Sequence, residues 1–199
     1  MSRRGALVAL AVAALAVAVW RAELFTVARP GDHPRALAVI DAAERRAVDF
    51  DIALPAVPVG IERLSAGGRV LLVHYWAPWE RHSLAQASAL DSMRSDPAFE
   101  RLRVVLVCFD PFPSVARYVG RNRLRLPVLL DGRRDLAARL PCPSIPYTYV
   151  VDEAGRIAVA QPGEVVWRSP AMRGALEGLL EEAQPPGPRP AATATSRAT

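Results

Sequence analysis

The sequence contains no lysine, only two cysteines and only three histidines. All 25 basic residues are therefore arginine, and the formal net charge is +5 at pH 7. Two cysteines allow at most one disulfide bond, and the cysteines and histidines show none of the spacings typical of zinc or copper sites. With 51% hydrophobic and 23% charged residues among 199, the composition predicts one folded domain with appendages.

The excess of arginine does not indicate a nucleic-acid-binding protein. The densest group of arginines, in residues 117–139, also contains Asp131 and Asp135, and no series of stacking aromatics interleaves with it. A bias toward GC-rich codons explains the exclusive use of arginine. We therefore expect no nucleic-acid partner.

The N-terminus indicates an export or anchoring segment. Two arginines precede an uncharged run over residues 5–20, which ends in Trp20. As a helix this run rises about 24 Å, which is marginal for a hydrocarbon core of about 30 Å. We expect residues 1–22 to be an uncleaved signal anchor; cleavage after Ala18, which would make the protein secreted, stays open. The positive-inside rule places the remaining chain in the periplasm or at the cell exterior.

The rest of the chain divides into three parts. Residues 23–47 are expected to form a spacer with a short helix over 34–47. Residues 48–182 carry the pattern of a folded domain. The tail, residues 183–199, is rich in Pro, Ala and Thr and is expected to be disordered.

Strand and helix patterns alternate within the folded part. Apolar runs predict strands at 70–76, 104–109 and 128–130, and a hairpin at 147–160. Helical periodicity predicts helices at 83–94, 114–118 and 133–140, and a last helix opened by Ser169-Pro170. Buried strands separated by helices indicate an α/β sandwich with a mixed sheet.

Five stretches in the right order resemble the membrane-anchored thioredoxin-like proteins of the TlpA/ResA type. These stretches are Phe50–Leu54, Gly68–Ala77, the following Pro-Trp-Glu-Arg-His-Ser, Val107–Asp110 and Ile145–Asp152. The resemblance implies a thioredoxin-like three-layer sandwich with helices on both faces of a mixed sheet, preceded by the N-terminal apolar helix. It also implies that the Ile145-Pro146 peptide bond is cis.

The resemblance places Glu80 and Ser83 where the family has the two cysteines of its Cys-x-x-Cys motif, with Arg81 and His82 between them. Disulfide exchange needs an attacking thiolate and a second thiol that resolves the mixed disulfide, so this motif cannot run it. A carboxylate at residue 80 would instead suit the electropositive start of a helix. The family docks extended partner segments in a groove here. Its implied residues are Trp76, Trp79, Glu80, Arg81, Ile145 and Pro146.

Other chemistries are less well supported. Cys108 and Cys142 are expected to be separated by the central strand, beyond the reach of a disulfide bond, so Cys142 is the thiol nearest the groove. A hydrolase triad of Ser83, His82 and Asp110 is disfavoured, because adjacent residues at a helix start point about 100° apart.

A metal site using His74, Glu80, His82 and a cysteine lacks ligand spacing, so we expect no metal and no cofactor. The sequence thus predicts a tethered, redox-inactive thioredoxin-fold module. It is expected to bind the membrane through residues 5–20 and an extended segment of a partner protein. The alternative is a thiol-disulfide oxidoreductase that uses Cys142, with or without Cys108.

Overall fold

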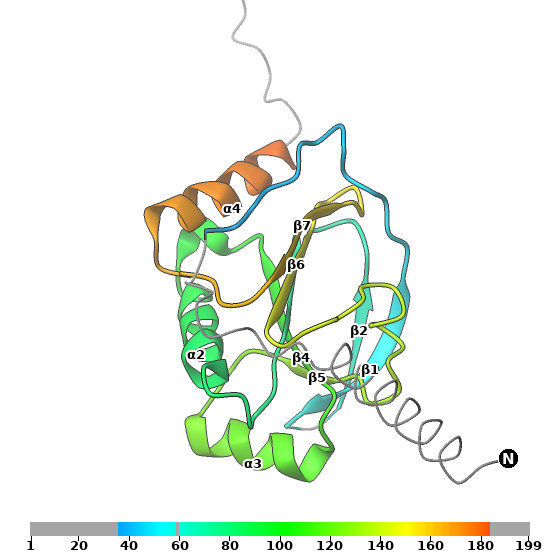
Figure 1. Ribbon diagram of the computed structural model, residues 1–199, viewed down its shortest axis with the longest axis vertical. Helices are drawn as coiled ribbons and strands as arrows, with labels where there is room; N and C mark the ends of the chain where they lie inside the picture. Colours follow the sequence, from blue (N-terminus) through cyan, green and yellow to red (C-terminus); the bar gives the residue numbers. More distant parts are fainter. Residues whose placement is uncertain (1–35, 59, 184–199) are drawn as a thin grey trace, which may run out of the picture.

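The computed structural model describes residues 36–58 and 60–183 (Figure 1). The expected anchor over residues 1–22, the first part of the spacer and all but Ala183 of the expected tail lie outside the described residues. In the part of the chain that is described, no helix has the length and apolar character needed to cross a bilayer.

The strands form one mixed sheet, as expected, and seven of them lie in the described residues; β2, at residues 61–65, was not predicted. They are β1 (Asp51–Val57), β2 (Ile61–Ser65), β3 (Leu71–Tyr75), β4 (Arg103–Cys108), β5 (Val128–Leu130), β6 (Tyr147–Val151) and β7 (Ile157–Pro162). The spatial order is β2-β1-β5-β4-β3-β6-β7. Strand β3 is central, pairing in parallel with β4 and antiparallel with β6. All five of its residues are buried, which explains its unbroken apolar pattern.

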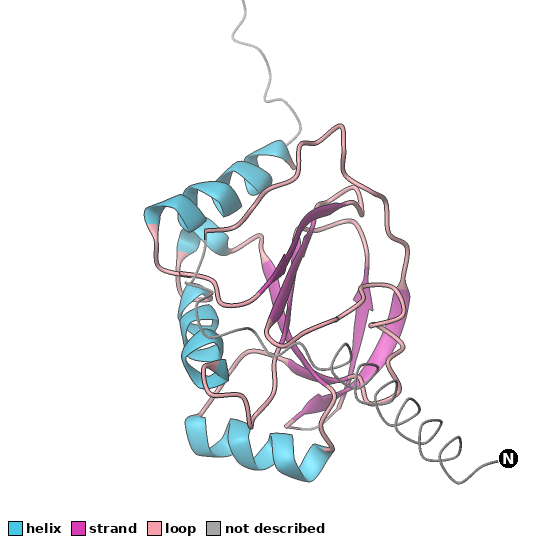
Figure 2. Cartoon of the chain, viewed as in Figure 1, coloured by secondary structure: helices cyan, strands magenta, loops and turns pink. Residues whose placement is uncertain are grey.

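The helices of residues 36–58 and 60–183 lie on one face of the sheet, whereas helices were expected on both faces. They are α2 (Ser83–Met93), α3 (Phe112–Asn122) and α4 (Pro170–Glu182), with a 3₁₀ turn, η1, at Pro97–Phe99. Figure 2 shows them together on one side of the strands. Their buried side chains pack into a single core cluster with the strand residues that point the same way, such as Leu72, Leu106 and Val150.

The opposite face is covered by a segment of turns, residues 131–143, where the sequence predicted a helix over 133–140. The buried Asp131 carboxylate accepts the amides of Leu136 and Ala137, at 3.2 and 2.9 Å, and so winds the chain into turns. The side chains of Leu136 and Leu140 join the second core cluster, with Val73 and other residues of this face. Burial is thus achieved without a regular helix.

The described part of the spacer is also not a helix. It runs along the outer edge of β7, where the Ala38 amide donates to the Gln161 side chain and the Ile40 amide donates to the Ala158 carbonyl. Ala47 forms an isolated antiparallel bridge with Arg156. The edge of β7 offers these backbone partners, which a local apolar periodicity cannot reveal.

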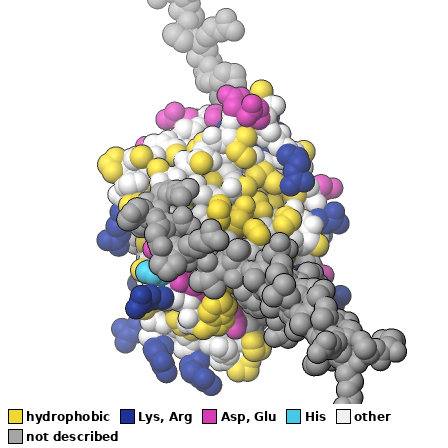
Figure 3. All heavy atoms as spheres, viewed as in Figure 1, with side chains coloured by type: hydrophobic (Ala, Val, Ile, Leu, Met, Phe, Trp, Pro, Cys, Tyr) yellow, Lys and Arg dark blue, Asp and Glu magenta, His cyan; other side chains and the backbone are white. Residues whose placement is uncertain are grey.

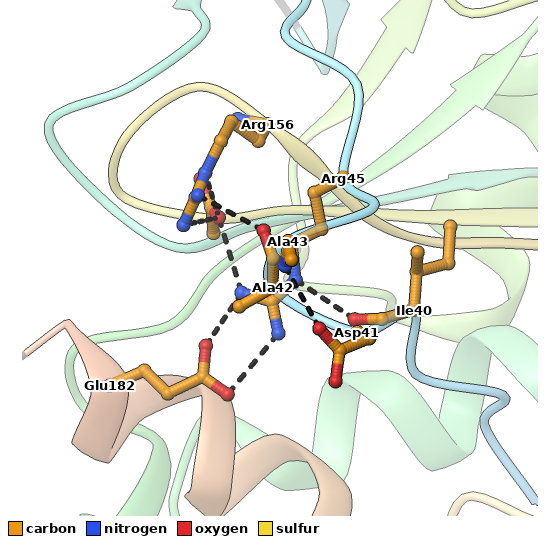
Figure 4. A network of polar contacts seen from close by, with 8 residues as sticks. Ile40, Asp41, Ala42, Ala43, Arg45, Arg156 and Glu182 are labelled. Atoms are coloured by element: carbon orange, nitrogen blue, oxygen red, sulfur yellow. Dashed lines mark hydrogen bonds and ion pairs between the residues drawn. The ribbon is translucent and has the colours of Figure 1, made fainter.

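A buried arginine fixes this segment to the domain (Figure 4). The guanidinium of Arg45 donates to Asp152 at 3.2 Å and to Glu182 at 2.6 Å, and its Nε donates to the Ile40 carbonyl. Asp152 also accepts from Arg156 in the β6–β7 turn. The network therefore joins the spacer, the β6–β7 turn and the last turn of α4.

The start of the last helix follows the sequence prediction. The Ser169 hydroxyl accepts the Met172 amide at 3.1 Å, and Pro170 occupies the first turn of α4. Helix α3 is longer than predicted: it begins at Phe112 after Pro111, so Ser114 lies inside the helix and does not cap it.

Candidate functional site

The carboxyl end of β3 leads into a tight turn before α2, and this turn carries the predicted motif. Trp76 is fully buried, whereas Trp79 has 64% of its surface exposed. Trp76 therefore supports the predicted groove from below and is not part of its surface. Trp79, with the exposed Arg81 and His82, forms the outer rim of the turn.

Glu80 and Ser83 are bonded to each other at the two motif positions. The Ser83 hydroxyl donates to a Glu80 carboxylate oxygen at 3.0 Å and accepts the Ala77 amide at 3.3 Å. The same carboxylate accepts the His82 amide at 3.0–3.1 Å. Helix α2 begins at Ser83 with His82 as its N-cap, so Glu80 lies just outside the helix and closes the preceding turn.

Helix α3 packs beneath this turn. The ring of Tyr118 lies 4.8 Å from the ring of Trp76, centroid to centroid. Burial, together with the nearby charge of Glu80, raises the pKa of Tyr118 to about 12. Residues 77–83, called the Glu80 turn from here on, are therefore next to the middle of α3.

The predicted cis peptide bond at Ile145-Pro146 is confirmed. The Pro146 carbonyl accepts the Gly163 amide at 2.9 Å. Next along the chain, the Glu164 carboxylate lies 3.2 Å from Nδ1 of His82. The loop after β7 thus connects the cis-proline turn to the Glu80 turn through its contacts with Pro146 and His82.

A buried polar layer lies under the motif, and sequence reasoning missed it. Trp167 donates its indole N–H to the side-chain oxygen of Gln86, whose amide group donates to the Val165 carbonyl at 3.1 Å. His74 shares a 3.0 Å hydrogen bond with Thr148 and packs edge-on against Trp167. These residues are far apart in the sequence, so no local pattern identifies the layer.

Cys108 and Cys142 are free and lie on opposite faces of the sheet. Cys108 is part of the helix-side core, and Cys142 packs against the other cluster. Burial raises the pKa of each thiol to about 12. Both are therefore almost wholly protonated at neutral pH, and neither has the low-pKa environment of a redox-active cysteine.

Within the described part of the chain, the contacts do not assemble a hydrolase triad or a metal site. Ser83 donates to Glu80 and is buried, His82 pairs with Glu164, and Asp110 accepts from the Cys108 thiol at 3.4 Å. His74 lies inside the sheet. Among the described residues, no group of three or more His, Cys, Asp or Glu side chains could hold a metal ion.

A separate shallow hollow of about 500 Å³ opens at the carboxyl ends of β4 and β5. Phe109, Asp110, Phe112 and Arg133 are among its lining residues, and none of the predicted groove residues lines it. It lies beyond the start of α3, on the side of the site away from β6.

No family model matches the chain, and no curated protein matches it in sequence. Its fold, however, matches many solved structures. A DsbF homologue from Corynebacterium diphtheriae is 20% identical, with a TM-score of 0.56 over 77% of this chain and 96% of that one. The exposed lipoprotein thioredoxin of Streptococcus pneumoniae is 22% identical, with a TM-score of 0.55 over 67% and 99%.

StoA from Bacillus subtilis is 21% identical, with a TM-score of 0.51 over 68% of this chain and 99% of that one. These structures thus match over nearly their whole length, and this chain over 67–77% of its own. At these identities the comparison establishes the fold. The chain is a thioredoxin-like protein in fold, of the kind found in the DsbF-homologue and StoA structures.

Proposed function

We propose that this protein is a non-catalytic binding module, built on a thioredoxin-like domain whose dithiol positions are occupied by a carboxylate and a hydroxyl. The observation that carries the proposal is the hydrogen bond between Ser83 and Glu80. It joins the two side chains that stand where the family pattern has its cysteines. Neither group can form or resolve a mixed disulfide.

The groove is the part of the site suited to binding. Trp79 is a large, exposed aromatic on a turn held by three hydrogen bonds to Glu80, so it is ordered before a partner arrives. Exposed tryptophans are frequent anchors in protein interfaces. With Arg81 and the half-buried Ile145, Trp79 offers an apolar and basic surface to an extended segment of a partner protein.

The domain is proposed to act outside the cytoplasm, tethered by residues 5–20. The flanking arginines of that run support this orientation, as does the description of the pneumococcal neighbour as an exposed lipoprotein. A thiol-redox or cytochrome c maturation context is the one that the resemblance implies. Trp79 and its turn would there hold a redox partner or its substrate without exchanging disulfides.

The alternative, an oxidoreductase acting through Cys142 or a Cys108–Cys142 pair, has less physical support. A nucleophilic thiol must be deprotonated and exposed, whereas burial raises the pKa of both thiols to about 12. The two thiols also lie on opposite faces of the sheet, where they cannot form a reversible pair.

Two measurements on the full chain test the proposal. In insulin reduction with dithiothreitol, the wild-type rate should equal that of the Cys108→Ser/Cys142→Ser variant. In photo-crosslinking in cells, a benzoylphenylalanine at position 79 should give a discrete adduct. The same probe at Ile61, which is 76% exposed on the β2 edge, is the matched control.

The outcomes separate the two readings. Turnover well above the cysteine-free variant would establish the oxidoreductase instead. A position-79 probe that gives no adduct, or only the adducts seen at position 61, would reject the groove as a binding site.

A further inference from the structure

We propose that arginines at the junction of α2 and α3 form a second docking surface, which binds an acidic segment of a partner protein. The arginine cluster consists of Arg94, Arg117, Arg121, Arg123 and Arg125. All five are exposed. This inference goes beyond the proposed function, and only its choice of a protein as the partner rests on that function.

Described contacts bring the members of the cluster together. Arg117 and Arg121 are one helical turn apart on the solvent-facing side of α3. Arg123 caps the helix and Arg125 follows it. From the end of α2, Arg94 donates to the Arg125 carbonyl at 2.9 Å. Basic side chains gather at the end of the molecule where α3 lies (Figure 3).

The cluster is not neutralised by carboxylates in the described part of the chain. Other arginines, including Arg45, Arg103 and Arg173, form ion pairs there, whereas none of the five does. The nearby Asp91 accepts the backbone amides of Arg125 and Leu126 with one oxygen, Oδ1, at 3.1 and 2.8 Å, and forms no ion pair with the five arginines among the described contacts. Five positive charges therefore face solvent together.

The backbone at Arg123 would suit glycine better than arginine. Arg123 has a φ of 53° at the C-cap of α3, a left-handed conformation that glycine adopts without steric cost. A single arginine in the last turn would satisfy the helix dipole, and Arg121 already occupies it. Arginine at residue 123 adds a charge at a position where glycine would be more stable.

The position of α3 points to a protein partner. Tyr118, between Arg117 and Arg121 on the chain, packs on Trp76 directly below the Glu80 turn. The middle of α3 therefore adjoins the Glu80 turn, whereas Arg94, Arg123 and Arg125 lie at the far end of α2, so the cluster and the proposed groove are neighbouring but separate surfaces. Guanidinium groups bind carboxylates with two parallel hydrogen bonds, so a run of glutamates or aspartates is the complementary chemistry.

The test uses the full chain in a non-ionic detergent and a fluorescein-labelled peptide containing six glutamates. Fluorescence anisotropy should show weaker binding, by about three- to tenfold, for Arg117→Gln/Arg121→Gln. The matched control is Arg46→Gln/Arg69→Gln, which removes the same charge from exposed positions elsewhere and should change the affinity less than twofold. A peptide with six glutamines should not bind.

The variant Arg123→Gly separates binding from folding. It should keep or raise the melting temperature, because the strained φ is relieved, and still weaken peptide binding. An equal loss of peptide affinity in Arg117→Gln/Arg121→Gln and in Arg46→Gln/Arg69→Gln would mean that only net charge matters, and would overturn the proposal.

Two competitors test the class of partner. Displacement of the peptide at a tenth of its concentration would overturn the choice of a protein, whether by phosphatidylglycerol in mixed micelles of the same detergent or by a single-stranded oligonucleotide of equal charge. The Trp79 crosslinks report on the groove separately, so failure of the cluster and failure of the groove are distinguishable.

Discussion

Acidification should destabilise the domain through His74. This side chain is fully buried in β3; its Nδ1 is bonded to Thr148, and its Nε2 has no hydrogen-bond partner among the described residues. Burial lowers its pKa from 6.5 to about 3, because the charged imidazolium would lose its hydration inside the sheet.

The direction of the effect follows from proton binding. Between pH 6.5 and about 3 the unfolded chain binds a proton that the folded protein does not bind. The free energy of unfolding must therefore fall as the pH falls through this range. One pH unit corresponds to about 1.4 kcal/mol, so lowering the pH from 7.5 to 5 should remove about 2 kcal/mol.

Urea unfolding followed by circular dichroism at pH 7.5 and pH 5 measures this difference. The range lies above the normal titration of carboxylic acids, although burial raises the pKa of Asp131, whose protonation would act in the opposite direction. His74→Asn keeps a polar partner for Thr148 but cannot titrate, and its stability should change by less than about 0.5 kcal/mol between the two pH values. His82→Gln controls for the exposed histidine that faces Glu164.

Two results would contradict the reasoning about His74. One is a wild-type stability that is unchanged at pH 5. The other is a loss of the same size in His74→Asn as in the wild type, which would assign the effect to other groups.

Further predictions concern the ion pairs and the motif. Arg45→Met should lower the free energy of unfolding by about 3 kcal/mol, because it leaves Glu182 unpaired and weakens the bonding of Asp152. The control is Arg173→Met, which removes an exposed ion pair and should lower the free energy of unfolding by less than about 1 kcal/mol in the same urea titration. Ser83→Ala should cost about 1–2 kcal/mol, since it removes hydrogen bonds to Glu80 and Ala77; an unchanged urea midpoint would show that these bonds do not hold the turn. Glu80→Cys/Ser83→Cys should create a reactive dithiol. The pKa of the thiol at residue 80, measured from the rate of its reaction with iodoacetamide, should lie below about 8.5. A pKa equal to that of a free cysteine would mean that the turn no longer tunes this position.

The strands of this fold could be predicted from sequence because burial fixes their pattern. Residues 71–75 are apolar apart from His74, and all are buried between neighbouring strands, so an unbroken run identifies the strand. The helix cap at Ser169 could be predicted from the local Ser-Pro pattern, and the cis peptide at Pro146 from the resemblance to the family. These features determine the position of the site.

The errors arose where distant partners decide the local structure. Apolar spacing over residues 34–47 suggested a helix, but in its described part Gln161 and Ala158 of β7 supply hydrogen-bond partners that favour an extended chain. The segment after Asp131 likewise has helical spacing, yet the aspartate side chain competes for its amides. The Gln86–Trp167 contact could not be read from the sequence at all, because its two members are 81 residues apart.

The attachment of the spacer to β7 has a mechanical consequence. A force applied to the chain ahead of residue 36 would first peel Ala38 and then Ile40 from β7, breaking few bonds at a time. The force would then act on the ion pairs of Arg45 with Asp152 and Glu182, which we call the Arg45 clasp. This network distributes the load between the β6–β7 turn and the end of α4. That clasp lies at the end of the sheet opposite to the Glu80 turn, since β6 runs antiparallel to β3. Tension applied ahead of residue 36 would thus be resisted at one end of the domain, while the Glu80 turn at the other end stays unloaded.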